Sequence, residues 1–194
     1  MKIGILGGTF DPVHVGHLAL ATYAIKQFKL DKVFFVLSAR PPHKQAARPM
    51  SSVRHRLAML KLAVGDSKKM IVSNLEVRRP GPSYMVRTLK KLRKMFPREK
   101  LYLVLGQDSY GSLNRWHRPD EIKKMVRFLV ARRPGCVVPK HAGTRTAWIR
   151  MPPLDIASSK IRKNFVVKTK EMEMQLSPKV ADYVRRHRLY RKGI

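Results

Sequence analysis

Two histidines in a glycine-rich segment near the start of the chain are the residues best suited to chemistry. His14 and His17 follow an apolar run at residues 2–6 and the pair Gly7 and Gly8. Glycines let the backbone approach a ligand closely and expose its amide groups. The N-terminus of the helix expected after this segment favours an anion. Because both imidazoles lie on one side of that N-terminus, they can donate hydrogen bonds to phosphate oxygens, and the segment predicts a phosphate-binding turn.

Two other roles remain open for these histidines. Each could cap the helix or pack in the core, but two histidines on one face of a glycine-rich turn favour ligand binding. An HxxH pair can also hold a metal ion, although no third ligand lies nearby in the sequence. The segment has neither the GxGxxG pattern of dinucleotide-binding proteins nor the Gly-Lys-Ser/Thr of a P-loop.

Apolar strands alternate with amphipathic helices along the chain. These elements position the predicted phosphate-binding turn. The pattern predicts strands over residues 2–6, 33–37, 70–74, 101–105 and 127–132, and helices over 15–28, 51–64 and 83–96, with two more after residue 158. Such alternation indicates a parallel sheet covered on both faces. We therefore expect a Rossmann-like α/β fold, an open parallel sheet in a single domain over 1–194, with a small helical part from about 158. These sheets bind ligands beyond the carboxyl ends of their strands.

The charge of the chain is unusual for its length of 194 residues. It has 42 Lys and Arg against 12 Asp and Glu, a formal net charge of +30, whereas a small domain typically carries about 2–8. The basic residues are spread along the whole chain, and such a charge predicts non-specific binding of nucleic acid. A basic nucleic-acid-binding protein is therefore an alternative function, although the chain lacks clustered aromatic residues and a known nucleic-acid module.

Other classes of protein are excluded by composition. The single cysteine, Cys136, excludes an internal disulfide framework and a multi-cysteine zinc site. No run of apolar residues is long enough for a membrane span, and the first residues do not form a signal peptide. We therefore expect a cytoplasmic protein with no membrane partner. The oligomeric state is not specified by the sequence.

Short motifs occur in order along nearly the whole chain. Residues 7–17, GGTFDPVHVGH, resemble the signature of the nucleotidyltransferase superfamily, whose members carry an (H/T)xGH element. Within it, the chain resembles the bacterial nicotinate-nucleotide adenylyltransferases. The matching segments are PPHK at 41–44, ExxR at 76–79, PSY at 82–84, GQD at 106–108, Trp116, RPG at 133–135, ASSKIR at 157–162, Tyr183 and LY at 189–190.

This resemblance implies a reaction and a set of site residues. The family transfers an adenylyl group from ATP to nicotinate mononucleotide, giving nicotinate adenine dinucleotide and pyrophosphate in NAD biosynthesis. The implied catalytic residues are His14, His17 and Arg162, the last at the N-terminus of a second helix. The implied ATP site comprises Gly7, Gly8, Thr9, Phe10, His14, His17, Gly106, Asp108, Ser158, Ser159 and Arg162. The implied mononucleotide site comprises Thr9, His43, Lys44, Tyr84, Met85, Tyr110 and Trp116.

Some of these assignments have simpler alternatives. Asp108 could cap a helix, Ser158 and Ser159 could do the same, and Trp116 could fill the core instead of stacking on a pyridine ring. We expect Mg²⁺ to arrive bound to the ATP phosphates, with no metal site built by the protein. Nicotinamide mononucleotide or phosphopantetheine are alternative acceptors.

The chain also departs from the family pattern at three positions. Met85 stands where Thr is usual, Arg87 where Asp is usual and Ala157 where Ser is usual. If position 85 acts through its backbone amide, the first change is tolerable. The third removes one hydroxyl but leaves the two that follow it.

Overall fold

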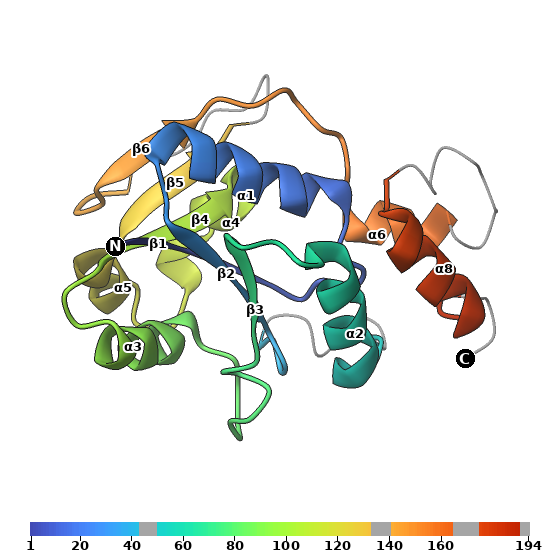
Figure 1. Ribbon diagram of the computed structural model, residues 1–194. Coiled ribbons are helices and arrows are strands. Elements are labelled where there is room, and N and C mark those ends of the chain that lie inside the picture. Colours follow the sequence, from blue (N-terminus) through green and yellow to red (C-terminus); the bar gives the residue numbers. More distant parts are fainter. Residues whose placement is uncertain (43–49, 133–140, 165–174, 191–194) are drawn as a thin grey trace.

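A six-stranded sheet forms the centre of the protein in the computed structural model, which describes residues 1–42, 50–132, 141–164 and 175–190 (Figure 1). Its strands are β1 (Lys2–Gly8), β2 (Lys32–Leu37), β3 (Met70–Ser73), β4 (Lys100–Gly106), β5 (Arg127–Ala131) and β6 (Thr146–Ile149). The order is β3-β2-β1-β4-β5-β6, and every neighbouring pair is parallel. The winding reverses between β1 and β4, which makes the carboxyl ends of these two strands the expected ligand-binding point.

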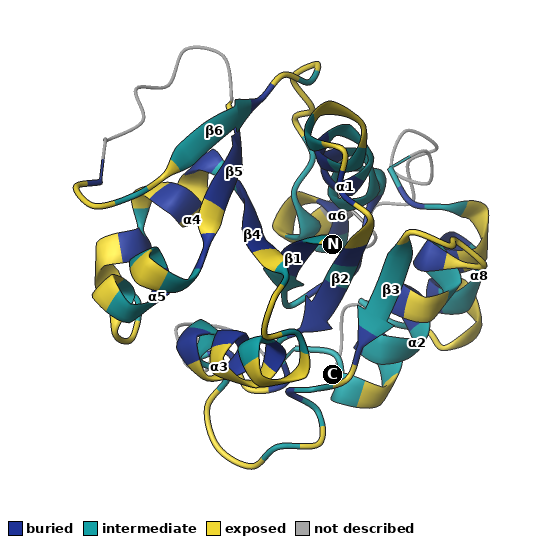
Figure 2. Cartoon of the chain, turned by 60° about the vertical axis from the view of Figure 1, so that its left-hand side comes forward, coloured by how far each residue is buried: buried dark blue, intermediate teal, exposed yellow. Residues whose placement is uncertain are grey.

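Helices cover both faces of this sheet. They are α1 (Val15–Phe28), α2 (Val53–Val64), α3 (Met85–Met95), α4 (Gln107–Gly111), the 3₁₀ turn η1 (Leu113–Arg115), α5 (Pro119–Met125), α6 (Ser158–Asn164) and α8 (Pro178–Arg186). Buried side chains of α1, α2 and α8 form one apolar cluster with the sheet, and those of α3, α4 and α5 form another on the opposite face. In Figure 2 the inner strands β1, β2, β4 and β5 are largely buried, while the edge strands β3 and β6 are mostly half-buried.

The two clusters follow from the alternation of side chains along the strands. In β4, Leu101, Leu103 and Leu105 join the cluster around α3, while Tyr102 and Val104 join the cluster around α1. A strand that is buried on both sides has no polar face, which is why these segments read as unbroken apolar runs.

The predicted Rossmann-like α/β fold is confirmed, with some differences in its elements. Helix α1 has the predicted limits, and the backbone N–H of His55 donates to the Ser52 hydroxyl at the start of α2 (3.3 Å). The sequence prediction missed β6, α4 and α5. Strand β6 has only four residues, TAWI, and begins with Thr and Ala, so it carries less apolar signal than β3, which has the same length but begins with MIV. Within the described part of the chain, no helix combines the length and apolarity required to cross a membrane.

Candidate functional site

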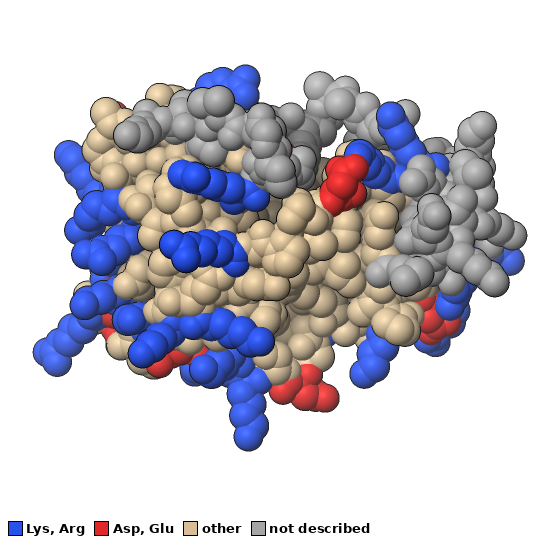
Figure 3. Space-filling view, turned by 90° about the horizontal axis from the view of Figure 1, so that it is seen from above, with Lys and Arg blue, Asp and Glu red and all other residues tan. Residues whose placement is uncertain are grey.

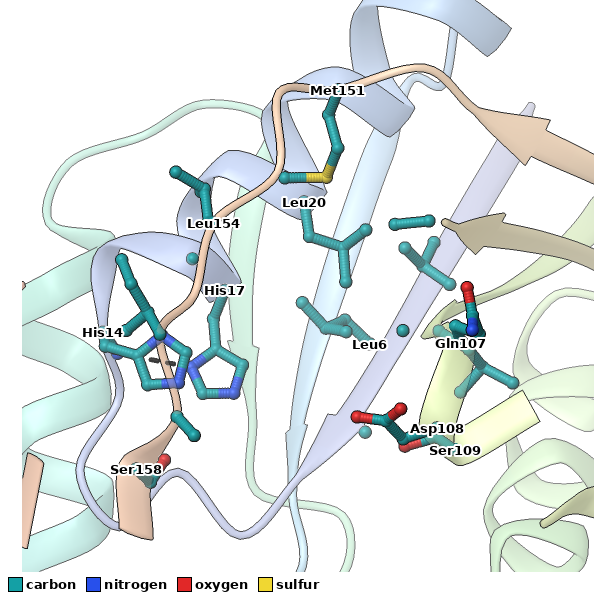
Figure 4. Close-up of a pocket in the computed structure, with 18 of the residues that line it drawn as sticks. Leu6, His14, His17, Leu20, Gln107, Asp108, Ser109, Met151, Leu154 and Ser158 are labelled. Carbon is teal, nitrogen blue, oxygen red and sulfur yellow. Dashed lines mark hydrogen bonds between the residues drawn. The ribbon is translucent and has the colours of Figure 1, made fainter. Parts of the chain in front are cut away.

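A cavity of about 380 Å³ opens at the carboxyl ends of β1 and β4. Its walls are the start of α1, the turn from β4 into α4, and the segment from Met151 to Arg162. Figure 4 shows His14 and His17 on one side of this space and Asp108 and Ser109 on the other. The cavity therefore lies at the switch point of the sheet, where the fold predicts a ligand.

The two histidines of the glycine-rich turn form a stacked pair. Their ring centroids are 3.7 Å apart with an interplanar angle of 29°. The backbone N–H of His14 donates to Nδ1 of His17 at 3.2 Å. An acceptor Nδ1 assigns the proton of a neutral His17 ring to Nε2, so this nitrogen is a hydrogen-bond donor.

Two neighbours fix the position of this pair. Phe10 packs edge-on against the ring of His17, with centroids 5.0 Å apart, and is itself fully buried. A Cβ atom on Gly16 would lie 3.1 Å from Nδ1 of His14, so a side chain there would push the ring away from its observed position. Phe10 was predicted to bind ATP, but it does not line this cavity. Its side chain packs behind His17, and its contact with ATP stays a prediction.

Helix α6 is tied to the same turn by two hydrogen bonds. The Ser158 hydroxyl donates to the Pro12 carbonyl at 2.9 Å, and Nη1 of Arg162 donates to the Asp11 carbonyl at 2.6 Å. Both side chains line the cavity, as does Ser159. Arg162 lies in the last turn of this seven-residue helix. The prediction that it stands at a helix N-terminus was therefore wrong.

The opposite wall is formed by the turn at the end of β4. Gly106, Gln107, Asp108 and Ser109 all line the cavity. Asp108 lies in the first turn of α4 and is exposed. Its carboxylate can accept hydrogen bonds from ribose hydroxyls, as expected from the sequence.

A second cavity, of about 310 Å³, adjoins the first one. Its lining includes Tyr84, Met85 and Trp116 from the predicted mononucleotide site. The indole N–H of Trp116 donates to the Ser112 hydroxyl at 3.2 Å, which fixes the plane of this half-buried ring. The two cavities share four lining residues, Gly7, Thr9, Leu105 and Ser109, so ligands in them would meet beside the end of β1.

Among the described residues of the predicted mononucleotide site, Tyr110 does not line this cavity. Tyr110 is buried, and its hydroxyl hydrogen-bonds Thr144 and Thr146 at 2.9 Å each, so its side chain links α4 with the start of β6. His43 and Lys44 lie outside the described residues. Gly8, predicted for ATP, lines the second cavity instead of the first.

A buried arginine that the sequence prediction missed holds the ends of β1 and β2 together. The Arg56 guanidinium donates to four main-chain carbonyls, those of Ser51 (2.9 Å), Thr9 (3.0 Å), Ser38 (2.7 Å) and Ala39 (3.1 Å). Burial lowers the pKa of Arg56, and the nearby Asp11 partly offsets this effect. A buried guanidinium that crosslinks loops cannot be distinguished by its sequence from the many surface arginines of this chain.

Asp11 links the same region to the end of the described chain. Its carboxylate accepts hydrogen bonds from the Tyr190 hydroxyl (2.7 Å) and from the backbone N–H of Ser51 (3.3 Å). Burial, together with the adjacent Asp11 carboxylate, raises the pKa of Tyr190 well above its usual range, so the phenol stays protonated and donates. The Asp11 side chain therefore supports the turn and leaves the cavity to other residues.

The sequence prediction also missed part of the lining. An apolar wall of the first cavity comes from Leu20, Met151, Leu154 and Ile156, and His117 lines the second cavity and stacks on Tyr84. The available signal for this wall was the set of apolar residues between β6 and α6, since α6 reaches the site. For the HxxH pair, no third His, Cys, Asp or Glu joins it to form a metal-binding group among the described residues.

Comparison with known proteins gives consistent matches over nearly the whole chain. A family model described as cytidylyltransferase-like matches residues 5–164. A protein of Thermomicrobium roseum, named "Probable nicotinate-nucleotide adenylyltransferase", is 37% identical over 98% of this chain and 92% of its own length. A protein of the same name from Thermus thermophilus is 36% identical over 98% of this chain and 100% of its own.

Solved structures show the same fold. The structure of a Plasmodium falciparum nicotinic acid mononucleotide adenylyltransferase complexed with APC superposes with a TM-score of 0.80. The two chains are 20% identical, and the match covers 97% of this chain and 96% of the other. At this identity the likeness supports the fold alone, while the curated relatives carry the family assignment.

Proposed function

This chain belongs to the nicotinate-nucleotide adenylyltransferase family within the cytidylyltransferase-like proteins, and we propose that it transfers the adenylyl group of ATP to nicotinate mononucleotide. The observation that carries this proposal is the pair of adjoining cavities at the switch point of the sheet. One has hydrogen-bond donors for a polyphosphate, and the other has an aromatic side chain for a flat ring. Their shared wall brings the two phosphates of the substrates together.

In the proposed reaction, a phosphate oxygen of the mononucleotide attacks the α-phosphorus of ATP. A bond from this oxygen to the α-phosphorus forms, the bond from the α-phosphorus to the bridging oxygen breaks, and its electron pair leaves with pyrophosphate. Such a step requires positioning and charge stabilisation rather than a covalent nucleophile. This assignment is supported by the four residues that line both cavities, since substrates bound in the two cavities would meet beside them.

We assign the stabilisation of the developing charge to His14, His17 and Arg162. The hydrogen bond at Nδ1 of His17 sets its Nε2–H as a donor, and Arg162 brings a permanent positive charge to the same cavity. ATP would enter as its Mg²⁺ complex, in which the ion neutralises part of the phosphate charge. Asp108 would accept hydrogen bonds from the ribose.

A pyrophosphate-release assay tests this function directly. The purified chain is incubated with MgATP and, separately, with nicotinate mononucleotide, nicotinamide mononucleotide and phosphopantetheine. We expect pyrophosphate and nicotinate adenine dinucleotide to appear together in equal amounts with the first acceptor. If phosphopantetheine were the only acceptor that supported turnover with MgATP, the chain would be a different transferase.

We also expect the carboxylate of the acceptor to be recognised. The second cavity is lined by Met85, the first residue of α3, and the N-terminus of an eleven-residue helix favours an anion. Arg87, in the first turn of this helix, adds positive charge, with its guanidinium 5.7 Å from the centre of the Tyr84 ring. The kcat/KM for nicotinate mononucleotide should exceed that for nicotinamide mononucleotide by at least about tenfold. Equal values would show that the ring substituent is not recognised.

Trp116→Ala should weaken binding of the mononucleotide selectively. Stacking of a flat ring on an aromatic side chain contributes about 1–3 kcal/mol, so the KM for the mononucleotide should rise by about 5- to 150-fold. The KM for ATP, measured on the same variant, should change little because Trp116 lines only the second cavity. A comparable rise in both values would indicate that Trp116 fills the core and supports the fold instead.

A further inference from the structure

Every strand of the sheet begins with a basic residue or directly follows one. We call this set the strand-start row, and it consists of Lys69 (β3), Lys32 (β2), Lys2 (β1), Lys100 (β4), Arg127 (β5) and Arg145 (β6), in the order of the strands across the sheet. Because all six strands are parallel, all six cations lie at the same edge of the sheet, the one formed by the amino ends of the strands. Neighbouring strands are about 4.8 Å apart, so the row crosses the sheet over about 24 Å.

Backbone pairing confirms that the members of the row are neighbours. Lys2 is the register partner of Lys100. The Lys69 carbonyl accepts from the N–H of Val33, next to Lys32, at 2.7 Å, and the Arg145 carbonyl accepts from the N–H of Phe128, next to Arg127, at 2.8 Å. These contacts place the six cations in three adjacent pairs, and the strand order sets the pairs side by side across the sheet.

The charges of this row are exposed and not neutralised by ion pairs. Five of its members are exposed, and Lys2 is half-buried with its Nζ donating to the Phe28 carbonyl at 3.2 Å. Among the described residues, no side chain of the row forms a salt bridge. Two carboxylates at this edge are engaged with main-chain nitrogens: Asp31 accepts from the N–H of Lys2 (2.6 Å), and Glu99 lies 4.0 Å from the N-terminal amine.

Helix ends add further positive charge to the same side of the molecule. A helix that connects parallel strands runs opposite to them, so its last turn returns to the edge where strands begin. The last turns of α1, α2, α3 and α5 contain Lys26, Lys61, Arg93, Lys94, Lys123 and Lys124, of which Lys123 is ion-paired with Asp120 at 3.0 Å. Figure 3 shows many Lys and Arg side chains projecting from its left-hand side, where the N-terminus lies in Figure 1.

We propose that the strand-start row binds the sugar-phosphate backbone of nucleic acid. A line of unpaired cations matches a linear polymer with a regular phosphate spacing, and each contact releases counterions from the polymer. The exposed large apolar side chains of the described residues are Met1, Met95 and Leu154, with no aromatic ring among them. Without rings for stacking on bases, binding at this edge depends on phosphates and is independent of sequence.

This surface lies away from the nucleotide cavities. The cavities open at the carboxyl ends of the strands, whereas the row lies at their amino ends. Nucleic acid on the row therefore leaves the cavities open, and the proposal does not depend on the reaction proposed above.

The test compares two triple variants of the full chain. The row variant carries Lys32→Gln, Lys100→Gln and Arg127→Gln. The control carries Arg54→Gln, Lys163→Gln and Lys179→Gln, which are exposed residues of α2, α6 and α8. Each variant lowers the formal net charge by three, from +30 to +27. Matched net charge separates the effect of position from the effect of total charge.

Binding is measured by fluorescence anisotropy with labelled 20-base-pair duplexes of two unrelated sequences over a salt series. The row variant should bind both at least about tenfold more weakly in low salt, and its slope of log K against log salt should fall by about 2.7. The control should change the affinity less than about threefold. When the protein is saturated with duplex, the rate of pyrophosphate release and the KM for ATP should be unchanged.

Four results would overturn the proposal. Equal losses in both triples would show that total charge, not this edge, governs binding. A clear preference for one duplex would show readout of bases. Inhibition competitive with ATP would place the duplex in the nucleotide cavities. If the row variant lost binding to phosphatidylserine vesicles but still bound the duplexes normally, the row would be a membrane-binding surface. Thermal unfolding of each variant checks that the fold is retained.

Discussion

Replacing His17 with alanine is expected to lower kcat by a factor of about 10²–10³, with a much smaller change in the KM for ATP. The donor lost is one that the fold orients in advance, since the His14 N–H holds Nδ1 and the Phe10 ring packs against the imidazole. A donor fixed before the reaction does not have to reorganise as charge develops on the phosphates. Its contribution is therefore largest in the transition state, and kcat falls more than binding does.

Steady-state kinetics with varied ATP at saturating mononucleotide separate these two effects. His187→Ala is a matched control, because this exposed histidine lies just beyond α8 and lines neither cavity. It should retain nearly full turnover. If His17→Ala also turned over at the normal rate, His17 would be excluded from the catalytic residues. If it raised the KM for ATP as strongly as it lowered kcat, its role would be ordinary ground-state binding.

How far the sequence predicted the fold depended on local signals. Helix α1 was predicted with its observed limits because the glycine-rich turn before it and the apolar spacing within it agree. The inner strands were recognised because burial on both faces removes polar residues from them. Strand β6 was missed because its residues, TAWI, begin with Thr and Ala, whereas the equally short edge strand β3 begins with the apolar run MIV. Helix α4 is too short, at five residues, to show a helical period.

Residues that were assigned to the candidate site for their own chemistry lie close together in the structure. His14, His17, Asp108 and Arg162 all line one cavity although they come from distant parts of the chain. The sequence is less informative where long-range packing decides the direction of a side chain. Tyr110 follows the same turn as Asp108, but its side chain points inward and its hydroxyl hydrogen-bonds Thr144 and Thr146. No spacing rule distinguishes these two directions.

Arg56 is the clearest example of a role that depends on packing, and its loss should have the largest effect on stability. Arg56→Met would remove all four hydrogen bonds of the guanidinium. The carbonyls of Ser51, Thr9, Ser38 and Ala39 would then lack their partner. A buried acceptor without its partner costs about 1–3 kcal/mol. Because relaxation and water entry make such costs less than additive, we expect a loss of at least about 3 kcal/mol in the free energy of unfolding.

Urea unfolding of Arg56→Met, Arg56→Lys and the control Arg54→Met measures this effect. Arg54 lies on the same helix but is exposed, so its replacement should change stability by less than about 0.5 kcal/mol. Arg56→Lys keeps the charge but lacks the planar fork, and its stability should fall between that of Arg56→Met and the unmodified chain. Equal stabilities for Arg56→Met and Arg54→Met would show that the four hydrogen bonds are dispensable. A loss of stability together with a lower kcat in the folded protein would show that the arginine also positions the wall shared by the two cavities, because one of its acceptors is the carbonyl of Thr9.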